Sequence, residues 1–94
     1  MTSDPAVRLI VSGRVQGVGY RAWAVTVALD LGLRGRVRNR VDGTVEILAI
    51  GRQDRIDRLV RDCADGPTAA RVAAVQRIHA LDDRSVSFSQ RTTG

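Results

Sequence analysis

The stretch Ser12-Gly13-Arg14-Val15-Gln16-Gly17-Val18-Gly19-Tyr20-Arg21 decides how the rest of the chain is arranged. An alternating apolar run leads into it and a run with helical spacing leads out of it, so we expect a strand, a glycine-rich turn and a helix N-terminus. Such a turn is a ready anion-binding site, because the first N–H groups of the helix are unpaired and the helix dipole is positive there. The dipole disfavours a cation in the first helical turn, and an anion clamped by Arg21 would explain the arginine at this position. These residues alone also fit a plain connecting turn followed by a surface arginine.

The apolar spacing along the whole chain predicts five strands and two helices. The expected strands are residues 6–13, 33–39, 44–50, 71–79 and 85–91, and the expected helices are residues 20–31 and 53–64. The order β-α-β-β-α-β, with an additional C-terminal edge strand, is that of the ferredoxin-like split-βαβ fold of the α+β class. We therefore expect two helices packed on one face of a mainly antiparallel sheet. We also expect a bulge in the strand at 71–79 and fraying of residues 92–94.

This topology brings two parts of a candidate site together. Right-handed connections make strands 6–13 and 33–39 parallel, with strand 44–50 antiparallel between them. The two parallel strands then end at the same edge of the sheet, one in the glycine-rich turn and the other at Asn39. Asn39 alternates in step with the apolar residues of its strand, so we expect its side chain on the helix-covered face, near the helix start at Arg21.

Composition limits the class of protein and the cofactors. Ninety-four residues are enough for one small domain, spanning 1–94, and all 15 basic residues are arginine. The net charge of +5 suits an anionic partner, either a small phosphate compound or a nucleic acid, and does not choose between them. The single cysteine, Cys63, and the single histidine, His79, exclude an internal disulfide and a cysteine- or histidine-rich metal site. We expect no metal and no cofactor.

Neither membrane association nor secretion is indicated. No apolar run approaches the ~20 residues of a membrane span, and residues 1–5 lack the basic and apolar parts of a signal peptide. We therefore expect a soluble, cytoplasmic protein without a membrane partner, acting as a monomer.

Two stretches of the chain resemble the signatures of the acylphosphatase family. Residues 13–21 resemble the first signature, in which an aromatic residue precedes an arginine, and Gly35-Arg36-Val37-Arg38-Asn39 resembles the second. The resemblance covers nearly the whole chain, in order and at matching spacing. It implies an α/β sandwich, hydrolysis of acyl phosphates to a carboxylate and phosphate, and Arg21 and Asn39 as the two catalytic side chains. The chain departs from the second signature at Arg36, where the family usually has an aromatic residue. Alternation places Arg36 on the uncovered face of the sheet, so we expect altered surface packing there and intact chemistry.

This reaction gives each candidate site residue a role. The phosphoryl oxygens would be held by backbone amides of the turn, those of Val15, Gln16, Gly17, Val18, Gly19 and Tyr20. Arg21 would clamp two of these oxygens, and Asn39 would orient the attacking water, since an amide both donates and accepts hydrogen bonds. An acyl phosphate already carries a good leaving group, so positioning and charge neutralisation are enough without a metal. We expect inorganic phosphate or sulfate to compete with the acyl phosphate substrate.

Two other functions are compatible with the pattern. RNA-recognition modules share this topology and stack bases on aromatic residues of the sheet. Here the expected sheet offers only Phe88, on its last edge strand, so we expect no specific nucleic-acid partner. The anion site could also belong to a binding or accessory module without turnover. Hydrolysis of benzoyl phosphate or acetyl phosphate, measured with and without a chelator, separates these functions.

Overall fold

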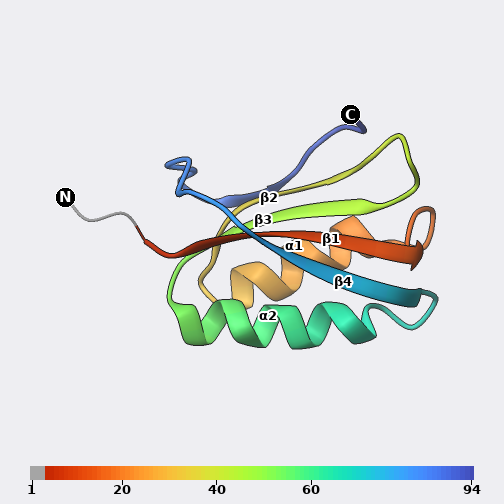
Figure 1. The fold of residues 1–94 in the computed structure, drawn as a ribbon, viewed down its shortest axis with the longest axis horizontal. Coiled ribbons are helices and arrows are strands. Elements are labelled where there is room, and N and C mark those ends of the chain that lie inside the picture. The colour runs from red at the N-terminus through yellow and green to blue at the C-terminus, as the bar shows by residue number, and fades with distance from the viewer. Residues whose placement is uncertain (1–3) are drawn as a thin grey trace.

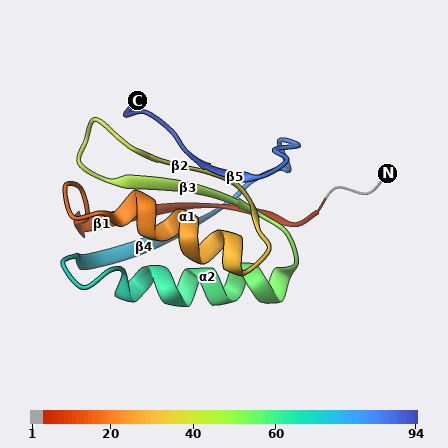
Figure 2. The ribbon, with the colours of Figure 1, turned by 180° about the vertical axis from the view of Figure 1, so that it is seen from behind.

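The computed structural model describes residues 4–94 and consists of one mixed β-sheet with two helices packed on one of its faces (Figure 1, Figure 2). The strands are β1 (Ala6–Arg14), β2 (Arg34–Asn39), β3 (Val45–Ile50), β4 (Arg71–His79) and β5 (Phe88–Gln90), and the helices are α1 (Tyr20–Asp30) and α2 (Gln53–Asp65). Residues 1–3 lie outside the described residues. The predictions that concern these three residues, the start of the domain at residue 1 and the lack of a signal peptide, therefore rest on the sequence alone.

The strands are arranged in the order β4-β1-β3-β2-β5. β3 runs antiparallel to both β1 and β2, so β1 and β2 are parallel to each other, as predicted. β4 is antiparallel to β1, and β5 is parallel to β2. The predicted ferredoxin-like α+β fold, with both helices on one face, is confirmed (Figure 2). The ends of β1 and β2 therefore lie at the same edge of the sheet.

The predicted bulge is present where β4 pairs with β1. Ala74 lies opposite Ser12, whereas Val72 lies opposite Gly13, so one residue of β4 has no partner in the ladder. Gly13 has a φ of 114°, and a Cβ there would lie 2.2 Å from the carbonyl oxygen of Arg71. Only glycine fits this position, and the bulge thereby fixes where the chain leaves the sheet to form the glycine-rich turn.

The core lies between the sheet and the helices and consists mostly of aliphatic side chains. The buried residues of the helices are Tyr20, Ala24 and Ala28 in α1 and Ile56, Leu59 and Cys63 in α2. The Tyr20 hydroxyl donates a hydrogen bond of 2.8 Å to the carbonyl oxygen of Cys63, which links the start of α1 to α2. Each fully buried leucine, isoleucine or valine contributes about 1.5–3 kcal/mol relative to an exposed one. Among residues 4–94, no helix is both long and apolar enough to cross a membrane.

The C-terminal strand is shorter than predicted. The sequence predicts a strand over residues 85–91, whereas β5 has three residues and Val86 is 94% exposed. The carboxylates of Asp82 and Asp83 each accept a hydrogen bond from the backbone N–H two residues further along the chain. Such local bonds compete with strand pairing, so the strand begins only at Phe88, whose ring is buried in the core.

The prediction that residues 92–94 fray is wrong. The tail continues along β2 after β5 ends: the N–H of Arg91 donates to the carbonyl oxygen of Val37 at 2.8 Å, and the N–H of Gly94 donates to that of Asn39 at 3.1 Å. The two donors are three residues apart whereas the two acceptors are two apart, so the tail follows β2 without extending the regular ladder of β5. As a result, the C-terminal segment reaches the end of β2 at Asn39.

Candidate active site

The loop of residues 15–19 joins β1 to α1 and has a conformation suited to binding an anion. Gly17 and Gly19 have φ angles of 73° and 79°, in the left-handed region that glycine adopts most readily. Within residues 4–94, no atom other than those of the glycine and its two chain neighbours lies within 4 Å of the position that a Cβ would take at either glycine, so the loop surface is open there. Gly19 is the N-cap of α1, and no side chain of the described residues caps this helix. The first N–H groups of α1 are therefore available to an anion.

Arg21 lies in the first turn of α1, as predicted, and is half-buried. Its Nη1 donates a hydrogen bond of 2.9 Å to the carbonyl oxygen of Arg91, so the C-terminal segment sets the direction of the guanidinium. Within residues 4–94 the guanidinium has no carboxylate partner. Its charge is therefore uncompensated at a helix N-terminus, where the dipole also favours an anion.

Asn39 is the last residue of β2 and lies opposite Val45 of β3. It alternates in step with Val37, which is fully buried beneath the helices, so its side chain is on the helix-covered face, as predicted. Its backbone carbonyl accepts the N–H of Gly94. Its half-buried side-chain amide has no hydrogen-bond partner among residues 4–94 and is free to bind a water or a ligand.

A cavity of about 130 Å³ brings the loop, Arg21 and Asn39 together. Its lining residues are Val15, Gly17, Gly19, Tyr20, Arg21, Ala22, Asn39 and Gln90. One water occupies about 30 Å³ in the liquid, so the cavity has room for about four waters. This volume is enough for a phosphoryl group with an attacking water beside it.

Of the six residues predicted to offer backbone amides, Gln16 and Val18 are not among the lining residues. Gln16 instead contributes its side chain, which the sequence did not predict. Its Nε2 donates hydrogen bonds of 2.8 Å to the carbonyl oxygens of Arg40 and Thr44, the two residues that close the turn after β2. Gln16 therefore fastens the glycine-rich loop to the strand end that carries Asn39.

Gln90 is the second residue of the cavity that sequence reasoning missed. It is the last residue of β5 and lies opposite Val37 in the parallel pairing with β2. The sequence predicts an edge strand here but gives no signal for its partner. Its position against β2 is what brings an additional amide side chain to the cavity.

Burial keeps the ionisable groups beneath the loop neutral. Burial raises the pKa of the Tyr20 hydroxyl well above its ordinary value and raises the pKa of the Cys63 thiol to about 12. Cys63 is 0% exposed and has no disulfide partner, so it packs as a small apolar residue and does not act as a nucleophile. Among residues 4–94, no group of three or more His, Cys, Asp and Glu side chains is arranged to hold a metal ion.

A larger hollow, of about 420 Å³, lies on the opposite, uncovered face of the sheet. It shares no lining residue with the smaller cavity. Size alone therefore does not identify the candidate active site. The smaller cavity is the one that combines an open helix N-terminus, an uncompensated arginine and an unpaired amide.

Comparison with known proteins identifies the family. The acylphosphatase family model matches residues 7–89. The acylphosphatase of Acidiphilium cryptum is 46% identical over 89 residues, which cover 95% of this chain and 98% of that protein. The solved acylphosphatase of Coxiella burnetii superposes with a TM-score of 0.90 at 32% identity, covering 95% of this chain and 94% of that one. The acylphosphatase of Bacillus subtilis gives a TM-score of 0.82 at 36% identity, covering 92% and 97%. The chain therefore belongs to the acylphosphatase family of hydrolases, whose function is the hydrolysis of acyl phosphates.

Proposed function

We propose that this chain is a metal-independent acylphosphatase that uses Arg21 and Asn39 as its catalytic side chains. One observation carries the proposal: the cavity of about 130 Å³ is lined at once by the glycine-rich loop, Arg21 and Asn39. The resemblance of both signatures to those of the family supports the same two residues.

The loop and Arg21 would hold the phosphoryl group. Backbone N–H groups between Val15 and Tyr20 donate to its oxygens at the positive end of α1. The guanidinium of Arg21 donates to two of these oxygens through its planar fork, which adds geometric specificity to charge. Its hydrogen bond to the Arg91 carbonyl uses Nη1 and leaves other N–H groups for the substrate.

Asn39 would orient the water. Its amide oxygen accepts a hydrogen bond from the water while the amide nitrogen donates to a phosphoryl oxygen or to the water. The water oxygen attacks phosphorus, the bond from phosphorus to the acyl oxygen breaks, and its electron pair leaves on the carboxylate. An amide is a poor base, so the proton of the water passes to a phosphate oxygen of the substrate.

The chemistry of the lining supports a mechanism without a metal. The described lining offers a guanidinium, two side-chain amides and backbone N–H groups, all of which suit an anion. Positive charge at the phosphoryl oxygens then comes from Arg21 and the helix N-terminus, and positioning supplies most of the remaining rate.

The proposal extends to the state of the protein and its partners. We propose one domain over residues 1–94 that acts as a monomer in the cytoplasm, with phosphate or sulfate as competing anions. The free, buried Cys63 suits a reducing compartment. A specific nucleic-acid partner is not proposed, because Phe88 is only 4% exposed. Within residues 4–94, the sheet therefore presents no open aromatic surface on which bases could stack.

Turnover of benzoyl phosphate tests the proposal. We expect hydrolysis by the purified chain that is unchanged in EDTA, with inorganic phosphate as a competitive inhibitor. Loss of activity in EDTA that a divalent ion restores would overturn the metal-independent mechanism. Saturable phosphate binding without any hydrolysis would instead indicate an accessory module that binds anions.

A further inference from the structure

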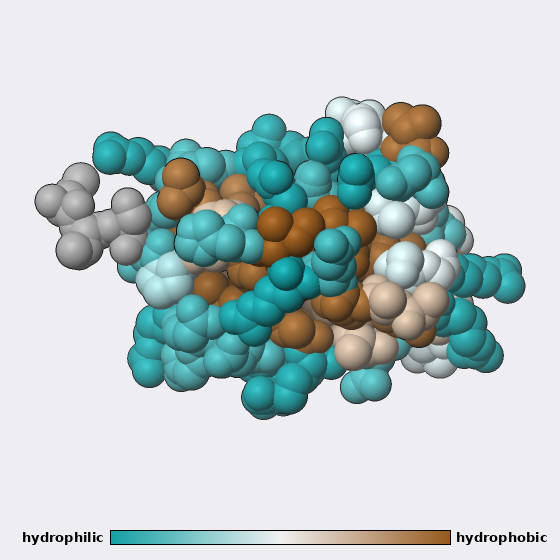
Figure 3. Space-filling view, viewed as in Figure 1, coloured by the Kyte–Doolittle hydropathy of each residue, from teal (hydrophilic) through white to brown (hydrophobic). Residues whose placement is uncertain are grey.

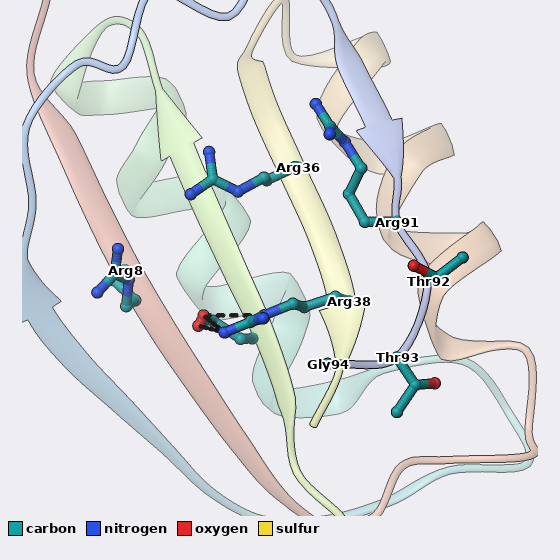
Figure 4. A pocket seen from close by; sticks show the side chains of 8 residues that line it. Arg8, Arg36, Arg38, Arg91, Thr92, Thr93 and Gly94 are labelled. Carbon is teal, nitrogen blue, oxygen red and sulfur yellow. Dashed lines mark hydrogen bonds and ion pairs between the residues drawn. The ribbon is translucent and has the colours of Figure 1, made fainter. Parts of the chain in front are cut away.

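The uncovered face of the sheet carries a basic hollow that plays no part in the proposed hydrolysis. The lining residues of this arginine hollow are Arg8, Arg36, Arg38, Glu46, Arg91, Thr92, Thr93 and Gly94 (Figure 4). The space-filling view of this face shows hydrophilic side chains lying across a hydrophobic strip (Figure 3). At about 420 Å³, the hollow has the size of a small-molecule site.

The strand register brings arginines to both sides of one residue. Arg8 on β1 and Arg36 on β2 each lie opposite Leu48 of β3. Adjacent strands are about 4.8 Å apart, so the backbones of the two arginines are roughly 10 Å apart, with Leu48 as the floor between them. Arg36 and Arg38 extend from β2 across β3 toward the strand that carries Arg8 (Figure 4). Guanidinium groups from two strands can therefore reach one ligand above Leu48.

Two of the four arginines of the hollow, Arg36 and Arg38, have a carboxylate partner within the described residues, and the other two have none. Arg38 holds the carboxylate of Glu46 through contacts of 3.1, 3.2 and 3.3 Å, so that carboxylate no longer repels an anion. Arg36 pairs with Asp83, but both side chains are about a third exposed, and a pair of this exposure is weak enough for a phosphate to replace the carboxylate. Arg8 and Arg91 form no ion pair with any of residues 4–94.

Packing accounts for the aliphatic parts of these side chains but not for their charges. Leu48 is only 3% exposed although it lies on the uncovered face, because the stems of the surrounding arginines cover it. An uncharged side chain of similar length would cover Leu48 equally well. Four guanidinium groups surround the hollow and only two carboxylates pair with them, so a net positive charge is left for an anion to neutralise.

We propose that the arginine hollow binds a small polyanion with two or more phosphate groups. The planar fork of arginine holds phosphate oxygens in pairs. Cations from three segments, β1, β2 and the C-terminal tail, suit several linked phosphates better than one. Within the described residues this face has no exposed aromatic ring on which bases could stack, which favours a small polyanion over a single-stranded nucleic acid.

Titration of the full, ¹⁵N-labelled chain with inorganic tripolyphosphate in metal-free buffer at physiological salt tests the proposal. We expect saturable shifts of the backbone amide signals of Arg8, Arg36 and Leu48, and at least tenfold weaker shifts of the same signals with orthophosphate. Signals of Gly17 and Gly19 report binding at the catalytic loop separately. The two sites are therefore distinguished within one spectrum, and failure at either one is seen independently of the other.

A pair of double variants separates the hollow from general charge. Arg8→Gln with Arg36→Gln should weaken tripolyphosphate binding at the hollow at least tenfold. Arg58→Gln with Arg61→Gln, which removes the same charge from α2, should change it less than twofold. Equal weakening in both variants, an absence of saturable shifts at Leu48 in the native chain, or tighter binding of an oligothymidylate at the same residues would each overturn the proposal. If the first variant fails to fold by circular dichroism, the titration of the native chain alone decides.

Discussion

Replacing Gln16 by alanine should both destabilise the fold and slow the reaction, although the Gln16 side chain does not line the cavity. The substitution removes two hydrogen bonds of 2.8 Å that fasten the glycine-rich loop to the turn after β2. Each such bond contributes about 0.5–1.5 kcal/mol net, so the free energy of unfolding should fall by about 1–3 kcal/mol. For a domain of this size, a loss of about 2 kcal/mol lowers Tm by roughly 8–16 °C.

The effect on turnover follows from the same two bonds. They hold the loop against Arg40, the residue directly after Asn39, and thereby fix the phosphate-binding amides relative to the water-orienting amide. A misplacement of about 1 Å between such groups costs about 10²-fold in rate. We therefore expect Gln16→Ala to reduce benzoyl phosphate turnover by about 10–10²-fold while the chain remains folded below its lowered Tm.

Gln53→Ala is the matched control for this prediction. Gln53 has the same side chain and makes one exposed hydrogen bond of 3.0 Å, to Asp57 within α2, so its loss should stay within about 0.5 kcal/mol. Urea unfolding and benzoyl phosphate hydrolysis are measured for both variants and the native chain. The reasoning is refuted if Gln16→Ala matches Gln53→Ala in stability and keeps native turnover.

Three further substitutions test other parts of the account. Arg21→Lys keeps the charge but loses the planar fork, so it should weaken phosphate inhibition as well as turnover; native inhibition by phosphate in the folded variant would contradict the clamp. The hydrogen bond from Arg34 lowers the pKa of Asp82 to about 2. The ionised Asp82 therefore stabilises the fold at pH values above about 3.9, its ordinary pKa, and this contribution is lost as the pH falls toward 2. Asp82→Asn should therefore be less stable than the native chain in urea at pH 7, with the difference closing near pH 2, and a constant difference would count against this linkage. Gly35→Ala would place a Cβ 1.8 Å from the carbonyl oxygen of Leu48 at a φ of 135°. It should therefore lower the free energy of unfolding by more than about 4 kcal/mol, and a native melting curve would show that the sheet is not packed as described.

The fold was predictable because it follows from short-range sequence patterns and from general rules of chain topology. Alternation and helical spacing locate the elements, and the right-handed crossover then fixes which strands are parallel. The same logic predicted the face on which Asn39 lies, because a period of two leaves only one alternative. That prediction, joined to the position of Arg21 at a helix start, was enough to locate the cavity.

The contacts at the site that the sequence did not predict depend on partners that are distant in the chain. The acceptors of Gln16 are 24 and 28 residues away and are backbone carbonyls, which carry no side-chain signal. The position of Gln90 depends on the pairing of β5 with β2, and that pairing also holds the tail that was expected to fray. The departure from the family signature predicted altered packing at Arg36 but did not predict its partner, Asp83. Asp83 lies 47 residues further along the chain, in the segment before β5 where aspartates bind the local backbone.

The most direct test of the central claim is the turnover of Asn39→Ala with benzoyl phosphate, measured together with its inhibition by inorganic phosphate. The proposed mechanism predicts a fall in turnover of about 10²–10³-fold, by analogy with the loss of one preorganised donor. Inhibition by phosphate should be nearly unchanged, because the loop amides and Arg21 remain. Near-native turnover in a variant that circular dichroism shows to be folded would contradict the role given to Asn39.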